Sequence, residues 1–77
     1  MAARIKMIWD FRGPDSLKYA QHHAIHLQQF CTRENLQDIE TGSEGFGEMH
    51  SIAFMVIPES LKLIIRDALK PNRAVIA

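Results

Sequence analysis

Three of the four histidines in this chain stand within five positions, in the run His22-His23-Ala24-Ile25-His26. An α-helix turns by about 100° per residue, so His22 and His26 would lie about 40° apart on one side of it. Neutral imidazoles spaced in this way face one point from adjacent turns, a geometry that chelates transition-metal ions. The spacing therefore predicts that His22 and His26 supply two metal ligands.

A complete metal site needs further strong donors, and the chain offers few. Cys31 lies about 140° around the helix from the pair, where the apolar stripe predicts that it faces the core. His50 is the remaining imidazole, but the expected strand places it near the start of the helix, about 10 Å short of His23 along the helix axis. We therefore expect no third ligand within one chain, so that a closed site would need a second chain.

His23 points in a different direction from its two neighbours. Its helical position lies in the apolar arc between Leu27 and Phe30. This position predicts a partly buried histidine whose ring shares a hydrogen bond with a backbone or side-chain partner.

Asp10 and His50 form a second candidate pair. If the strands that carry them are antiparallel neighbours, both residues lie at the same end of the sheet, and the carboxylate could orient the imidazole as a general base. A slip of one residue in the register would put them on opposite faces and leave His50 as a plain surface histidine. No nucleophile completes the pair, because the serines lack the context of a nucleophile elbow.

The first two elements follow from apolar periodicity. Residues 5–11 alternate in part, which predicts a strand, and residues 13–14 break it. Asp15 or Ser16 can cap a helix that runs to about Arg33. The expected inward stripe of this helix consists of Leu17, Ala20, Ala24, Leu27 and Cys31.

The rest of the chain predicts three strands and a helix. Residues 36–39 are interpreted as a short second strand, the glycine-rich residues 42–47 as a flexible turn, and the segment from Glu48 or Met49 to Ile57 as a third strand. The third strand is apolar on both faces, which indicates a central position. Pro58 fits the first turn of a second helix that ends before Pro71. Its expected core stripe is Leu61, Ile64, Ile65, Ala68 and Leu69.

A short last strand over residues 73–77 completes this order of elements, which resembles the split βαβ arrangement of ferredoxin-like folds. We therefore predict one α+β domain over residues 1–77, with two helices on one face of an antiparallel sheet. The other face would expose apolar residues of the third strand. These are either Ile52, Phe54 and Val56 or Met49, Ala53, Met55 and Ile57, and Ile8 adds to one choice. Such a patch predicts a homodimer that forms through the open face of the sheet.

Composition narrows the class of protein. The 77 residues carry nine basic and nine acidic side chains, so the formal net charge is zero, and we expect no nucleic-acid partner. The longest apolar run, residues 52–57, is too short to cross a bilayer, so we expect no membrane span. The lone cysteine, Cys31, predicts a reducing, cytoplasmic compartment.

These observations leave three functions open. The first is a non-enzymatic, self-associating binding or regulatory module that takes a small ligand or a protein partner. The second is a transition-metal-binding protein that uses His22 and His26. The third is a cofactor-independent enzyme that resembles the dimeric α/β-barrel oxygenases, with Trp9, His23 or His50 lining a pocket beneath the helices. The sequence identifies no cofactor.

Overall fold

A computed structural model describes residues 3–77 of the chain. The elements in chain order are β1 (Arg4–Arg12), α1 (Ser16–Arg33), β2 (Glu40–Gly45), β3 (His50–Pro58), the 3₁₀ turn η1 (Glu59–Leu61), α2 (Lys62–Leu69) and β4 (Arg73–Ile76).

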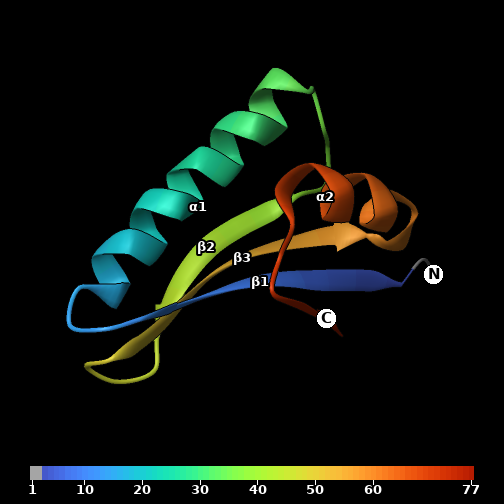
Figure 1. Cartoon of the computed structure of the whole chain (residues 1–77). Coiled ribbons are helices and arrows are strands. Elements are labelled where there is room, and N and C mark those ends of the chain that lie inside the picture. Colours follow the sequence, from blue (N-terminus) through green and yellow to red (C-terminus); the bar gives the residue numbers. More distant parts are fainter. Residues whose placement is uncertain (1–2) are drawn as a thin grey trace.

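The fold is α+β, with a four-stranded antiparallel sheet in the order β2-β3-β1-β4 and two helices. Both helices lie over the same face of the sheet, α1 along its length and α2 over the part where β3 ends (Figure 1). The strand expected at the C-terminus is present and pairs with β1, which places Ile76 beside Ile5. The central position expected for the third strand is confirmed, because β3 pairs with both β1 and β2.

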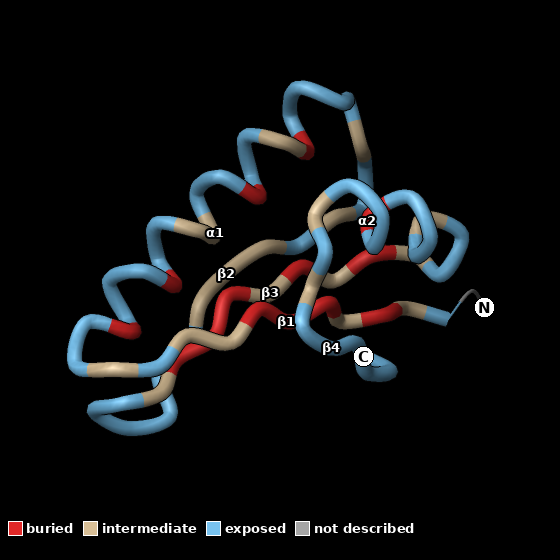
Figure 2. The backbone as a smooth tube through the Cα atoms, viewed as in Figure 1, coloured by how far each residue is buried: buried red, intermediate tan, exposed pale blue. Residues whose placement is uncertain are grey.

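The core lies between the sheet and the helices. Ile5, Met7 and Trp9 of β1 pair with Ile57, Met55 and Ala53 of β3, and all six are buried. Buried positions accordingly concentrate on β1, β3 and the inward side of α1 (Figure 2). From α1, Ala20, Leu27 and Cys31 are buried, so the prediction that Cys31 faces the core is confirmed.

We call the other side of the sheet the open face. By the register of the strands it carries Arg4, Lys6, Ile8, Asp10, Arg12, Glu40, Gly42, Glu44, His50, Ile52, Phe54, Val56, Pro58, Arg73 and Val75.

The apolar residues of the open face are less exposed than the sequence predicts. Ile8 is 5% exposed and Ile52 is 2% exposed. Phe54 and Val56 are half-buried, and the Lys6 ammonium lies 4.5 Å from the centre of the Phe54 ring. The long side chain of Lys6 therefore shields part of this face.

The second strand lies later in the chain than predicted. Asn35 and Asp38 have positive φ angles of 55° and 61°, which a strand does not adopt, so residues 36–39 form a connection. The glycine-rich segment that was expected to turn instead forms most of β2. A Cβ atom at Gly42 would lie 2.7 Å from Cζ of Phe54, so any other residue there would displace the Phe54 ring. The hairpin turn itself spans residues 46–49 and is closed by the Phe46 amide, which donates to the His50 carbonyl.

Both helix starts differ in detail from the expectation. Asp15 is the N-cap residue of α1, but its side chain makes no capping hydrogen bond, and the Ser16 hydroxyl instead pairs with Ser51 at 3.1 Å. Pro58 ends β3, and α2 begins only at Lys62.

The predicted stripe of α2 is partly wrong. Ile65 is fully buried, and Leu61 and Leu69 pack against the core. Ile64, in contrast, is 58% exposed, and Ala68 is also exposed. The helix has only eight residues, and it contacts the sheet along a narrower line than its apolar content suggests.

Candidate functional site

The open face carries a cluster formed by Asp10, His50 and Arg73. Nε2 of His50 lies 3.0 Å from Oδ1 of Asp10. Arg73 donates from Nε to Oδ2 and from Nη2 to Oδ1 of the same carboxylate, each at 3.2 Å. The register puts Arg12 opposite His50, so Asp10 and His50 share a face, and the predicted proximity of the two is present.

Arg73 is the residue that sequence reasoning missed. It reaches Asp10 because β4 pairs with β1 and places Arg73 opposite Ile8. Asn72 supports the same junction, since its Oδ1 accepts the Asp10 amide at 2.8 Å. The sequence pattern predicted the last strand but not that it pairs with β1, and this pairing brings Arg73 to Asp10.

The Asp10 carboxyl is held in its ionised form. The hydrogen bond from Arg73 lowers the pKa of Asp10 most, and the hydrogen bond from His50 lowers it further, against a smaller opposing effect of burial. The ionised carboxylate orients the His50 ring through Nε2, which leaves Nδ1 as the nitrogen for a second partner. The arrangement can act chemically as an oriented base or as a hydrogen-bonding contact.

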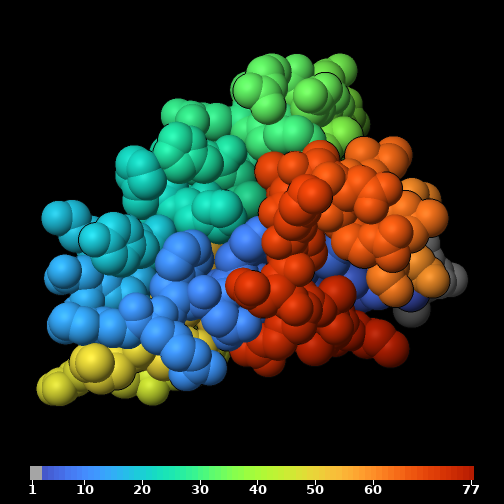
Figure 3. Space-filling view, viewed as in Figure 1, coloured from blue at the N-terminus to red at the C-terminus, as the bar shows by residue number. Residues whose placement is uncertain are grey.

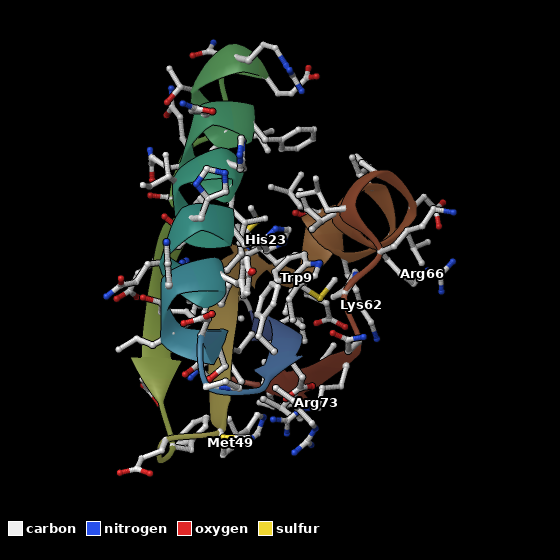
Figure 4. All side chains as sticks on the ribbon, turned by 60° about the vertical axis from the view of Figure 1, so that its left-hand side comes forward. Trp9, His23, Met49, Lys62, Arg66 and Arg73 are labelled. Carbon is white, nitrogen blue, oxygen red and sulfur yellow. The ribbon has the colours of Figure 1, made fainter. Side chains whose placement is uncertain are left out.

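His23 lies on the other side of the sheet, beneath the helices. Its ring centre is 5.2 Å from that of Trp9 and 5.6 Å from that of Phe11, and Figure 4 shows it directed from α1 toward Trp9. The Trp9 Nε1 donates to the carbonyl of Leu69 at the end of α2, at 2.9 Å. Within residues 3–77, Nε2 of His23 is buried without a hydrogen-bond partner, so this nitrogen does not make the expected hydrogen bond.

The surroundings of His23 favour the neutral ring. Burial lowers its pKa most, and the charges of His26 and His22 lower it further. Aromatic faces hold the ring in place, and no acceptor stabilises a second proton.

The stability of the protein should fall as the pH drops below about 6.5, the ordinary pKa of histidine. Because the pKa of His23 is lower in the folded chain, the unfolded chain binds the proton first. The stabilisation is complete above the unfolded pKa and is lost as the pH falls toward the folded pKa. Urea unfolding followed by circular dichroism between pH 8 and pH 5 would measure this loss.

The matched variant for this measurement is His23→Leu, which removes the titrating ring and keeps an apolar side chain. The difference in the free energy of unfolding between wild type and variant should change across this pH range. Two curves that stay parallel would show that His23 does not set the dependence.

His22 and His26 project from the exposed side of α1. Their Nε2 atoms are 2.9 Å apart, and the rings meet edge to face with centres separated by 4.5 Å. Across residues 3–77, no group of three or more His, Cys, Asp or Glu side chains is arranged to hold a metal ion. The thiol of Cys31 is buried in the core, and burial raises its pKa.

The candidate residues therefore occupy three separate places. His22 and His26 lie on the exposed side of α1, and His23 lies between α1 and the sheet. The Asp10–His50 pair lies on the open face. The space-filling view shows side chains of the N-terminal segment filling the surface between α1 and α2 (Figure 3). A shallow hollow beside His22 is lined only by residues of α1, namely Lys18, Tyr19, Gln21, His22 and Ile25. His23 and His50 therefore lie on opposite faces of the sheet.

Comparison of the chain with models of protein families, with curated proteins and with solved structures finds no match. Among the helices of residues 3–77, none is long and apolar enough to cross a membrane. Function is therefore inferred from the geometry of the three histidine environments described above.

Proposed function

We propose that this chain is a self-associating binding module that forms a homodimer through the open face of its sheet. The observation that carries the proposal is the distribution of charge on that face. Acidic side chains lie along one edge, on β2, and basic side chains lie on the two strands at the other edge.

The acidic edge consists of Glu40 and Glu44, which are register partners of Val56 and Ile52. On the basic side, Lys6 and Arg12 belong to β1 and Arg73 to β4. Asp10 is the exception, and Arg73 neutralises it through two hydrogen bonds. The net charge of the chain is zero, so repulsion between whole copies is weak.

This distribution selects one of the two simple ways to stack identical sheets. A two-fold axis that crosses the strands would lay β2 on the partner's β2 and oppose like charges. An axis parallel to the strands lays β2 over the partner's β4, which is next to the partner's β1. Each residue then has the same position along the strand direction in both copies. Glu40 then faces the basic side of the partner at the level of the partner's Lys6, because both residues are level with Val56.

The same axis makes the centre of the interface self-complementary. It places β3 over the partner's β1, and Ile8 and Phe54 share one height because they are register partners. Phe54 would thus pack against the partner's Ile8 on both sides of the axis. An apolar centre between charged borders is the usual arrangement in specific protein interfaces.

The Asp10–His50–Arg73 cluster lies toward one end of this face. In the dimer it would border the interface, where a small ligand or a protein partner can contact the His50 ring. This location at the border of the interface favours a binding or regulatory role for the cluster.

Sedimentation velocity tests the dimer directly. At tens of micromolar protein, wild type should sediment as a dimer, and Glu40→Lys or Lys6→Glu should each weaken the association by about tenfold or more, because each reversal opposes like charges at two symmetric places. The combined variant Glu40→Lys/Lys6→Glu should regain much of the lost affinity. Glu34→Lys, which makes the same charge change at the far end of α1, is the control and should behave as wild type.

Two results would contradict the proposal. A purely monomeric wild type at this concentration would exclude the dimer. A dimer that is unaffected by Glu40→Lys and Lys6→Glu would place the interface on another surface.

We further infer that the fold is of the ferredoxin-like class and that the protein is cytoplasmic. The strand order β2-β3-β1-β4, with α1 after β1 and α2 after β3, supports the first inference. The free, buried Cys31 supports a reducing compartment.

A further inference from the structure

The exposed side of α1 holds two imidazoles that already converge. His22 and His26 are both exposed, and their Nε2 atoms are 2.9 Å apart. At this distance one Nε2 donates its proton to the other Nε2, so the two nitrogens share one proton.

We propose that His22 and His26 form a bidentate site for a transition-metal ion, with Cu(II) as the preferred occupant. Imidazole nitrogens bind such ions at about 2.0–2.1 Å. Two nitrogens at that distance are about 2.9 Å apart when they subtend about 90° at the ion, and about 3.3 Å apart at the tetrahedral angle. The hydrogen-bonded separation of 2.9 Å is close to both values, so small rotations of the two exposed rings bring both nitrogens within reach of one ion.

The donor set favours Cu(II) as the occupant. Two neutral imidazoles without a carboxylate suit late transition metals, and among divalent ions affinity rises to Cu(II). The ion replaces the shared proton, and small rotations of the exposed rings direct both lone pairs at it. Water completes the coordination, since the hollow beside His22 is open along α1.

The spacing of His22 and His26 by one helical turn links metal binding to the stability of the folded chain. Chelation at positions i and i+4 requires the helical conformation of α1, so the ion binds the folded chain better than the unfolded chain. Cu(II) should therefore raise the midpoint of thermal unfolding of wild type. This site lies on α1, away from the open face, and does not depend on the proposed dimer.

Calorimetric titration of the full chain with Cu(II), supplied as its glycine complex at pH 7.5, tests the site. Wild type should bind one ion, and His22→Ala and His26→Ala should each weaken binding by at least about tenfold, since even partners outside the ligand set are worth about 10–100-fold. Gln29→Ala, which removes another exposed polar side chain of α1 and leaves every histidine in place, is the control and should bind as wild type. The variant His22→Ala/His26→Ala measures binding by all other donors.

Electron paramagnetic resonance gives a second measurement that does not depend on affinity. The wild-type Cu(II) spectrum should show coupling to two imidazole nitrogens, and His22→Ala/His26→Ala should lose it. Wild-type affinity no greater than that of this double variant, or binding as tight as wild type by either single variant, would overturn the proposal. Circular dichroism of each variant checks that α1 is intact, which is expected because both side chains are exposed.

Discussion

Replacing Trp9 with alanine should lower the free energy of unfolding by about 3–5 kcal/mol, the range observed when a buried aromatic side chain is truncated. Trp9 is 6% exposed and lies in the core. Its ring packs against His23 of α1, and its Nε1 donates to the Leu69 carbonyl at the end of α2. One side chain of β1 thus contacts both helices, and its loss leaves a cavity where they meet the sheet.

The loss should be large relative to the whole stability of the protein. A chain of 77 residues buries a smaller fraction of its unfolded surface than a larger domain does, and small domains are stable by only about 5–10 kcal/mol. Urea unfolding followed by circular dichroism would measure the change, because the variant has no tryptophan for fluorescence.

Two variants separate the sources of the Trp9 effect. Trp9→Phe keeps an aromatic ring but loses the hydrogen bond to Leu69, and it should lower stability less than Trp9→Ala. Phe46→Ala truncates an aromatic residue that is 54% exposed in the hairpin turn, and it should change stability by less than about 0.5 kcal/mol. If Trp9→Ala were no more harmful than Phe46→Ala, the assignment of Trp9 to the core would be wrong.

The parts of the fold that periodicity could predict are those with many buried side chains. The alternation in residues 5–11 and the helical stripe that ends at Cys31 each reflect burial of one face, and both elements are present. The contact between Asp10 and His50 followed from the same reasoning, because neighbouring antiparallel strands bring their residues to one end of the sheet.

The β2 strand could not be predicted because its residues bury little. Its sequence has two glycines and no large apolar residue, which is typical of a turn. Phe54 of the neighbouring strand extends over Gly42, so the packing surface on β2 is backbone. Apolar periodicity does not indicate this strand, because β2 has no buried side chain.

Arg73 was missed for a different reason. Its role at Asp10 depends on which strand β4 pairs with and in which register, and four exposed residues do not encode that choice. The exposure of the open face was also overestimated, since Ile8 and Ile52 are already covered within the chain. The dimer proposal consequently depends on the placement of charge more than on bare apolar area.

The division of the histidines into three environments makes their roles separable. A change at His26 should alter metal binding and leave the open face intact, whereas a change at Lys6 should alter association and leave the metal pair intact. A linked loss of both properties would require the two surfaces to communicate, and no element of the open face contacts the His22–His26 pair through a hydrogen bond.

Ile65→Ala should lower the free energy of unfolding by about 2–5 kcal/mol, whereas Ile64→Ala, the same substitution one position earlier, should change it by less than about 0.5 kcal/mol. Ile65 is fully buried and is the one residue of α2 that is completely enclosed in the core, whereas Ile64 is 58% exposed. Both residues are isoleucines on one short helix, so helix propensity and side-chain chemistry cancel in the comparison. Urea unfolding of the two variants under one set of conditions measures the difference. Equal losses would mean that α2 is rotated about its axis relative to this structure and that the apolar stripe read from the sequence, with Ile64 inside, is the correct one.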